Sequence, residues 1–277
     1  MSSAGRYRLV RRGLLSAVVG VLVCVVVAAP VSAFVSRRTH IAIVCESAGN
    51  PAGCASGAPW TFGSSTAICP TGQHVLFGGF ENGVAGMRRT ANNRWTVYGM
   101  HFAVPDTTDS GPPTALYSMA YCGYGPVASK ATSTVVVRNR GYETYGSATA
   151  RCPAGTVVVA GGFATTPDTV VLVTGLERVA ADLWRVSAFL VSNPHAALTS
   201  IAYCGPGPAP KLASKTMKNY VSGPVRATCP AGRQLVFGGA IVKGADSYLT
   251  TLRAKNQTTW TVGAIDGPEL TALAYCR

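Results

Sequence analysis

The apolar positions of this 277-residue chain fall in short runs that end at glycine, proline or small polar residues. Apolar runs of four to eight residues, bounded in this way, are typical of β-strands rather than helices. Thirty-one glycines separate runs that are rich in valine and threonine, which favours strands joined by tight turns. The pattern therefore predicts an all-β protein.

One such pattern occurs three times. It reads CPTGQHVLFGG, CPAGTVVVAGG and CPAGRQLVFGG, at 69–79, 152–162 and 229–239. Each copy is followed by a lone tryptophan and then by a small strand ending in Ala-Tyr-Cys; these are Trp95, Trp184 and Trp260, and Cys122, Cys204 and Cys276. Repetition at this period predicts a repeat architecture. We place the repeats at 59–126, 127–208 and 209–277.

Each repeat is expected to contain four or five strands. The Pro-x-Gly after the first cysteine predicts a turn, and the Gly-Gly pair is expected to break the next strand, as a bulge or a close approach of two backbones requires. Residues 34–58 form a lead-in with one strand at 39–45. Because a repeat of roughly 70 residues with one disulfide has a marginal core alone, we expect the three repeats to form one domain. Three such sheets around a pseudo-threefold axis predict a β-prism-like fold.

Residues 1–33 have the pattern of a signal peptide. Four arginines precede an apolar run from Gly13 to Pro30, and the small residues 31–33 suit signal peptidase. The run is also about long enough for an uncleaved membrane anchor. Cleavage predicts a secreted or envelope-associated protein with no stable membrane span.

Charge narrows the class of partner. The leader holds four of the 24 Lys and Arg and none of the 11 Asp and Glu, which leaves a net charge of +9 on the rest. This balance favours association with an anionic surface, such as an acidic envelope polymer. The basic residues are scattered without a run interleaved with aromatics, so the sequence does not predict nucleic-acid binding.

Eight cysteines follow the leader, and an even number in an exported chain predicts four disulfides. The simplest set pairs the first and last cysteine of each repeat, while the lead-in cysteines close a short loop. A circular set that joins neighbouring repeats, such as Cys122 with Cys152, is the alternative. The favoured pairs are Cys69–Cys122, Cys152–Cys204, Cys229–Cys276 and Cys45–Cys54.

The CPxG, Gly-Gly, W-x-V and A-Y-C elements resemble the repeat of secreted proteins common in high-GC Gram-positive bacteria, most of them uncharacterised. More remotely, the CPxG start and the threefold arrangement are similar to the vitelline membrane outer layer protein I family, a β-prism. The resemblance covers 59–277 and implies the fold. Sugar binding is suspected for the prism family, but no binding motif can be carried over residue by residue.

The sequence offers few candidates for chemistry. His74, His101 and His195 do not fall at equivalent repeat positions, and Ser64-Ser65 lacks the G-x-S-x-G elbow of a hydrolase. Asp106 and Asp109 lack the ligand series of a calcium loop, and the glycine pairs are not followed by the residues of a phosphate cradle. Asn256-Gln257-Thr258 matches a glycosylation sequon by pattern alone. We therefore predict no catalytic, cofactor or metal-binding residues.

Two functions remain open at this stage, and a third, a purely structural or host-interacting protein, is not separated from the first by the sequence. The first is a non-catalytic secreted or envelope-associated protein that binds a glycan or an anionic polymer. The alternative is a secreted hydrolase with a site on the variable loops near His101, Asp106 and His195. The repeated Trp and Tyr residues are expected in the core, because equivalent positions of a threefold fold fill equivalent spaces.

Overall fold

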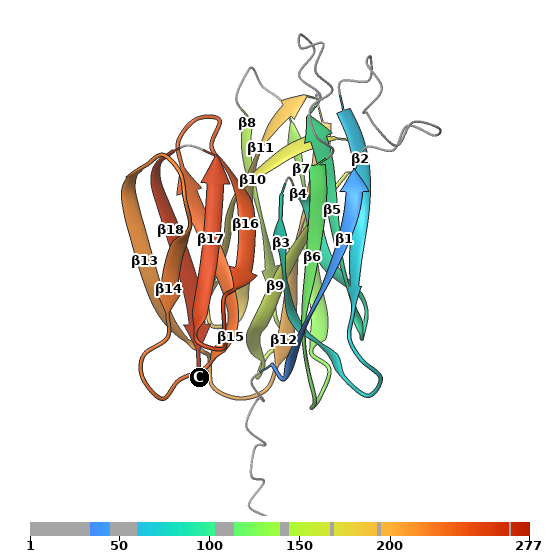
Figure 1. The fold of residues 1–277 in the computed structure, drawn as a ribbon, viewed down its shortest axis with the longest axis vertical. Helices are drawn as coiled ribbons and strands as arrows, with labels where there is room; N and C mark the ends of the chain where they lie inside the picture. Colours follow the sequence, from blue (N-terminus) through green and yellow to red (C-terminus); the bar gives the residue numbers. More distant parts are fainter. Residues whose placement is uncertain are drawn as a thin grey trace, which may run out of the picture. The chain divides into compact units, whose positions relative to one another are not determined.

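The structure is a computed structural model that describes residues 34–44, 60–82, 84–102, 114–138, 144–166, 169–192, 195–265 and 267–277. They belong to the compact unit Val31–Arg277. They form eighteen strands in three antiparallel sheets of six, and the strands run along the long direction of the unit (Figure 1). The all-β, prism-like fold expected from the sequence is therefore present.

The three sheets have the same makeup. Sheet A has the order β1 (Ser36–Val44), β6 (Thr114–Gly123), β3 (His74–Glu81), β16 (Tyr248–Ala254), β17 (Thr259–Ile265) and β14 (Val225–Thr228). Sheet B has the order β2 (Trp60–Ile68), β5 (Arg94–Phe102), β4 (Val84–Ala91), β9 (Val157–Thr165), β12 (His195–Gly205) and β7 (Ser129–Arg138). Sheet C has the order β13 (Lys211–Tyr220), β18 (Gly267–Cys276), β15 (Leu235–Lys243), β10 (Val170–Ala180), β11 (Leu183–Ser192) and β8 (Thr144–Arg151).

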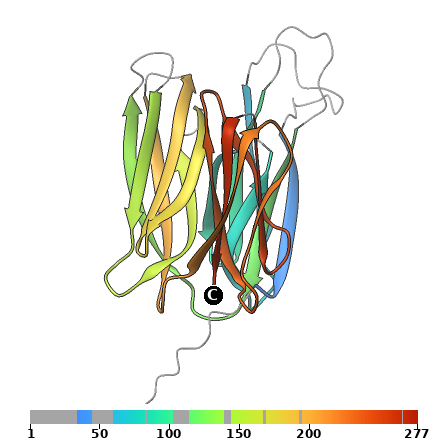
Figure 2. The same ribbon diagram turned by 90° about the vertical axis from the view of Figure 1, so that its left-hand side faces the viewer.

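Each sheet is shared between two repeats. The first, sixth and third strands of one repeat pair with the fourth, fifth and second strands of the preceding repeat. The exchange is cyclic, because repeat 1 pairs with repeat 3 in sheet A just as repeat 2 pairs with repeat 1 in sheet B and repeat 3 with repeat 2 in sheet C. Figure 2 shows the sheets side by side. The expectation of one sheet per repeat is wrong in this respect.

Each repeat contains six strands rather than four or five. The first strand of repeat 1 is β1, which lies in the segment expected to be a lead-in and pairs along its whole length with β6. The equivalent strands β7 and β13 pair with β12 and β18 in the same way. These first strands lack the cysteine, glycine and tryptophan landmarks of the repeat. The strand expected at 39–45 is therefore present as β1, but the sequence pattern did not assign it to repeat 1.

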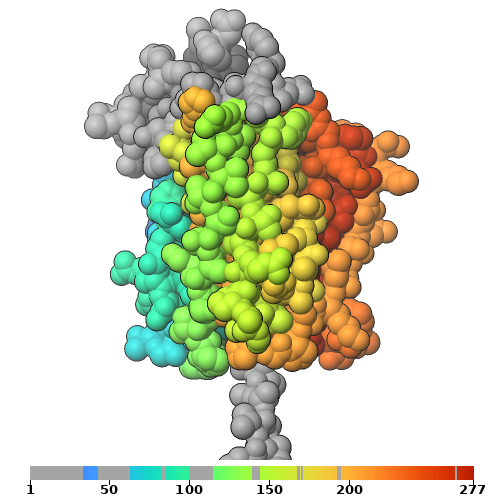
Figure 3. All heavy atoms as spheres, turned by 180° about the vertical axis from the view of Figure 1, so that it is seen from behind, coloured from blue at the N-terminus to red at the C-terminus, as the bar shows by residue number. Residues whose placement is uncertain are grey.

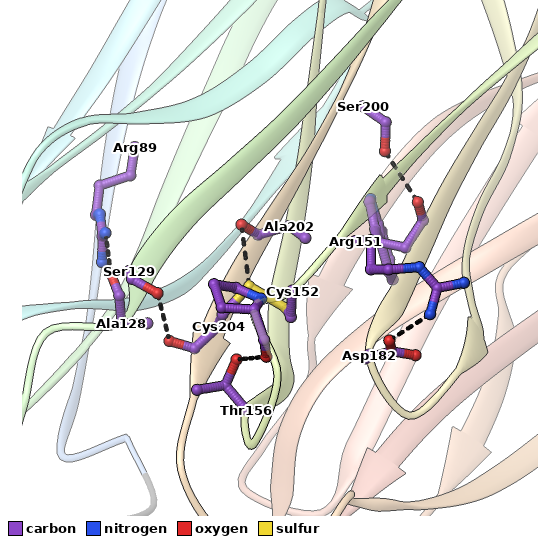
Figure 4. The surroundings of a disulfide bond; sticks show 12 residues. Arg89, Ala128, Ser129, Arg151, Cys152, Thr156, Asp182, Ser200, Ala202 and Cys204 are labelled. Carbon is purple, nitrogen blue, oxygen red and sulfur yellow. Dashed lines mark hydrogen bonds and ion pairs between the residues drawn. A yellow bond between two sulfur atoms is a disulfide. The ribbon is translucent and has the colours of Figure 1, made fainter.

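Three disulfides connect the sheets. The bonds Cys69–Cys122, Cys152–Cys204 and Cys229–Cys276 are the intra-repeat pairs, and Figure 4 shows the second of them. In each, one cysteine follows the second strand of a repeat and the other lies on the sixth strand, in a different sheet. The bonds therefore tie sheet B to A, C to B and A to C. Cys45 and Cys54 lie outside the described residues.

One core serves all three repeats. Buried side chains from the three sheets form a single cluster, and the largest fully buried residues include Trp95, Trp184 and Trp260 with Tyr121, Tyr203 and Tyr275. The rings interlock across repeats, because an aromatic residue of each repeat packs on the tryptophan of the preceding one, at centroid distances of 5.9–6.2 Å. The expected burial of the repeated aromatics is confirmed.

The Gly-Gly pair makes room for two different neighbours. A Cβ on Gly78, Gly161 or Gly238 would lie 2.0–2.1 Å from the indole of the same repeat. A Cβ on Gly79, Gly162 or Gly239 would lie 2.1–2.6 Å from a backbone carbonyl oxygen on the fourth strand of the preceding repeat. The close approach expected from the sequence is therefore correct, whereas the strand continues through the pair without the expected break.

The Pro-x-Gly turns are also built alike. Gly72, Gly155 and Gly232 have φ angles of 77–80°, a conformation that glycine adopts at little cost. In each turn the residue after the glycine donates its N–H to the proline carbonyl, at 3.0–3.1 Å. The expected turn is confirmed in all three repeats.

We predict that the Gly161→Ala substitution lowers the free energy of unfolding by about 1–3 kcal/mol or more, because the added methyl group overlaps the Trp184 ring in a packed core. Urea denaturation of both proteins measures the difference. Gly86→Ala is the matched control, since its Cβ would have no neighbour closer than 3.5 Å. Equal effects of the two substitutions would contradict this account of the first glycine.

Candidate functional site: seams and basic corners

We call the place where strands of two repeats pair inside one sheet a seam. The ladders there are short: β4 pairs with β9 at one residue pair, and β10 with β15 and β16 with β3 at two each. The tyrosine of the A-Y-C motif extends each of them. The hydroxyls of Tyr203, Tyr275 and Tyr121 accept the backbone N–H of Arg89, Arg178 and Ala254, at 2.6–2.8 Å.

Burial shifts the titration of these seam tyrosines. It raises the pKa of Tyr203 and of Tyr275 to about 12, and raises that of Tyr121 further. The hydrogen bonds and nearby arginines oppose this shift without cancelling it. The tyrosines therefore remain neutral under physiological conditions and act as structural hydrogen-bonding groups.

A cation covers two of the three tyrosine rings. Arg89 lies over Tyr203 and Arg178 over Tyr275, each at 4.7 Å from the ring centroid. Each guanidinium also donates to a carbonyl just before the first strand of the next repeat, Ala128 and Pro210 respectively (Figure 4 for Arg89). At the third seam the equivalent residue is Ala254, and the ring of Phe34 packs against Tyr121 instead, at 5.0 Å. The seams are thus alike in the repeated tyrosine and differ in what covers it.

The edge strands of neighbouring sheets meet at three corners, formed by β1 with β2, β7 with β8, and β13 with β14. Figure 3 looks from behind onto the green to yellow segments of repeat 2, which include the second corner. These six strands carry nine exposed Lys and Arg and no Asp or Glu; the nine are Arg37, Arg38, Lys130, Arg138, Arg151, Lys211, Lys215, Lys218 and Arg226.

Acidic residues in the described part of the chain lie outside the corner strands, and most of them are paired. The described residues contain five of the eleven Asp and Glu of the chain and nineteen of its 24 Lys and Arg. Four of the five acids form ion pairs: Asp182 with Arg151, Glu177 with Arg185, Glu269 with Lys243 and Glu81 with Arg253. Of the corner cations, Arg151 alone takes part in these pairs. Eight corner cations therefore have no acidic partner within the described part of the chain.

Two of the three alternative hydrolase residues lie in the described part of the chain, and they are on separate strands. His101 is the residue before the last of β5 and His195 begins β12, at the same end of sheet B but with two strands between them. Three strand spacings correspond to roughly 14 Å. His195 is exposed, while Asp106 and Asp109 lie outside the described residues.

A serine–histidine contact exists that sequence reasoning missed. At the first corner, Ser65 Oγ lies 2.9 Å from Nδ1 of His40 and donates to the backbone carbonyl of His40, also at 2.9 Å. Ser65 is 1% exposed, and its proton is directed to a carbonyl. It is therefore placed as a structural link between two edge strands rather than as a nucleophile. No sequence signal could have paired them, because the strands belong to different sheets.

The other candidates have structural surroundings. His74 is buried, its Nε2 has no partner among the described residues, and burial with the charge of Arg89 lowers its pKa. Asn256 accepts three hydrogen bonds from Thr258 and Thr259 through Oδ1, so it caps its own turn. Within the described residues no cluster of three metal-ligating side chains occurs, and no helix there is long and apolar enough to cross a membrane.

Comparison with protein-family models and with curated proteins finds no match for this chain. The disulfides of the structure indicate the redox environment of the protein. Three disulfides join the sheets, and such bonds form and persist in oxidising, extracellular environments.

We predict that stability falls as the pH rises from about 10 to about 12. Tyr203 and Tyr275 keep their protons in the folded state up to about pH 12, whereas unfolded tyrosine ionises near pH 10. The folded state thus binds more protons in this window, and the stability present below pH 10 is lost through it. Absorbance at 295 nm with parallel circular dichroism measures both steps; ionisation of every tyrosine near pH 10 in the folded protein would contradict the burial argument.

The Tyr203→Phe substitution should destabilise the protein by about 1–3 kcal/mol, because it leaves the N–H of Arg89 without an acceptor at the seam. Chemical denaturation provides the measurement. Tyr124→Phe removes a hydroxyl from an exposed ring and should change stability little. If the two variants unfold alike, the seam hydroxyl does not hold the repeats together.

Proposed function

We propose that this is an exported, non-catalytic protein that binds an anionic polymer of the cell envelope through its basic corners. The observation that supports this most is the separation of charge: the six edge strands carry nine exposed cations and no acid. A surface of one sign attracts polyanions and holds them by many weak contacts. The basic leader and apolar run at 1–33 support export.

The third corner is the strongest candidate for contact. Lys211, Lys215 and Lys218 lie on β13, the open edge of sheet C, and all three are exposed. Leu212 and Met217 on the same strand are 53% and 40% exposed. A strand with three unpaired lysines and apolar side chains between them fits an extended polymer that carries phosphate or carboxylate groups.

The charges also have a protective effect. Lysines on an open edge oppose pairing with another copy of the chain, so a basic edge alone does not require a ligand. Replacing the edge lysines by glutamate distinguishes ligand binding from protection of the edge. An acidic edge still opposes pairing with another copy of the chain, but it repels a polyanion. A neutral sugar is less well supported, since the three repeated indoles are buried and offer no stacking surface.

We predict that wild-type protein is retained on immobilised poly(glycerol phosphate) at low salt and released at high salt, because exposed charges are screened. The variant K211E/K215E/K218E should bind roughly 100-fold more weakly, at about 1 kcal/mol for each lysine, and should self-associate no more than the wild type.

The matched control is R94E/R233E/K255E, which changes the net charge equally outside the edge strands. This control should keep most of the affinity. Equal loss in both variants would show binding by net charge rather than by the β13 edge. A wild-type protein that is not retained at low salt would refute the proposed function.

A further inference from the structure

A second arginine lies beside the seam of repeats 2 and 3. Arg178 covers Tyr275 and donates through Nη2 to the carbonyl of Pro210. Arg277 donates through Nη2 to the carbonyl of Pro208, at 2.6 Å. One short loop, 208–210, therefore anchors both guanidinium groups. The backbone of Arg277 is fixed as well, because it exchanges two hydrogen bonds with Gln234.

Both guanidinium groups retain unused donors. Nη1 of Arg178 and Nε of Arg277 are buried and have no hydrogen-bond partner among the described residues. Neither arginine takes part in the ion pairs found there. Burial lowers the pKa of each, and the charge of Arg178 lowers that of Arg277 further. Two like charges that influence each other, with no ion pair to either among the described residues, destabilise the site, and an anion would relieve this.

This pair is not part of the repeated structure. At the seam of repeats 1 and 2, Arg89 occupies the place of Arg178, but Gly205 follows the A-Y-C motif where Arg277 follows it in repeat 3. At the remaining seam both positions lack arginine, with Ala254 and Gly123. The ring of Phe34 packs against the tyrosine there instead. The second arginine is therefore not required by the fold.

We propose that Arg178 and Arg277 form a binding site for a single tetrahedral oxyanion, a phosphate group. A planar guanidinium group matches the oxygen geometry of phosphate, and each of the two here has one nitrogen without a partner among the described residues. An anion bound here would take the unused donors beside the exposed residues 206–208. Lys211, the first residue of β13, follows the loop directly and adds a further positive charge. The site shares Lys211 with the β13 edge, but its two arginines lie outside the six corner strands.

The test is titration of the wild-type protein with inorganic phosphate at low ionic strength, followed by calorimetry and ³¹P NMR. We expect saturable binding with one phosphate per chain. Arg277→Gln should weaken it at least about tenfold, since hydrogen bonds between charged groups are the strong ones. Arg94→Gln removes the same charge from an exposed position on β5, outside the corner strands, and should leave affinity unchanged.

The Arg277→Lys variant, followed by circular dichroism, distinguishes a loss of binding from a folding defect. The lysine variant keeps the charge but loses the planar donors, so it should bind more weakly than wild type while melting at the same temperature. Absence of saturable phosphate binding to the wild type, or equal affinity of the wild type and Arg277→Gln, would overturn the proposal.

The source of the phosphate is decided by a second titration, with glycerophosphoglycerol, a phosphodiester. Binding of the diester with similar affinity indicates the backbone of a polymer, whereas binding of inorganic phosphate alone indicates a free or terminal phosphate. Both outcomes support the oxyanion site. Phosphate binding that depends on Arg277, without retention on the polymer, would refute the proposed function and leave this site in place.

Discussion

The close approach of two backbones at the second glycine of each Gly-Gly pair is the constraint on which the rest of the structure depends. The carbonyl oxygens of Met87, Leu176 and Leu252 occupy the space that a side chain would need there. Only one or two residue pairs form a ladder at each seam, so any added atom separates the strands. The first glycine adds a second condition, since the indole of its own repeat must lie against the sheet. Sheet continuity and core packing are therefore fixed by adjacent residues.

The cyclic exchange of strands explains why the repeats form one domain. Each sheet obtains half its strands from a neighbour, so a single repeat would expose two incomplete sheets and their apolar faces. The disulfides act in a complementary direction: each closes a loop of 47–53 residues within one repeat while joining two sheets. In the chain-entropy model a loop of this length contributes about 4 kcal/mol. Non-covalent contacts join repeats within a sheet, and covalent bonds join sheets within a repeat.

The sequence predicted those features that local chemistry determines. The Pro-x-Gly turn, the buried Trp184 and the pairing of Cys152 with Cys204 each follow from residue type and repetition. The exchange of strands did not follow, because homologous repeats present the same edges to each other, and a pattern of apolar positions fits pairing within or between repeats equally well. The first strand, β1, was missed as part of repeat 1 for a related reason: it has no landmark residue, and its role is fixed only by its pairing with β6.

The candidate sites were the least predictable part, because they depend on contacts between residues far apart in the chain. Arg178 and Arg277 are separated by almost a hundred positions and meet only when two repeats share a sheet. His40 and Ser65 meet only where two sheets share a corner. Repetition nevertheless gives a rule for finding such residues. Residues that recur in all three repeats, such as the A-Y-C tyrosine, have a structural role at the seams. A residue that differs at one seam is not needed for that role and can have another function. Arg277 satisfies this rule because the equivalent glycines complete their seams without it.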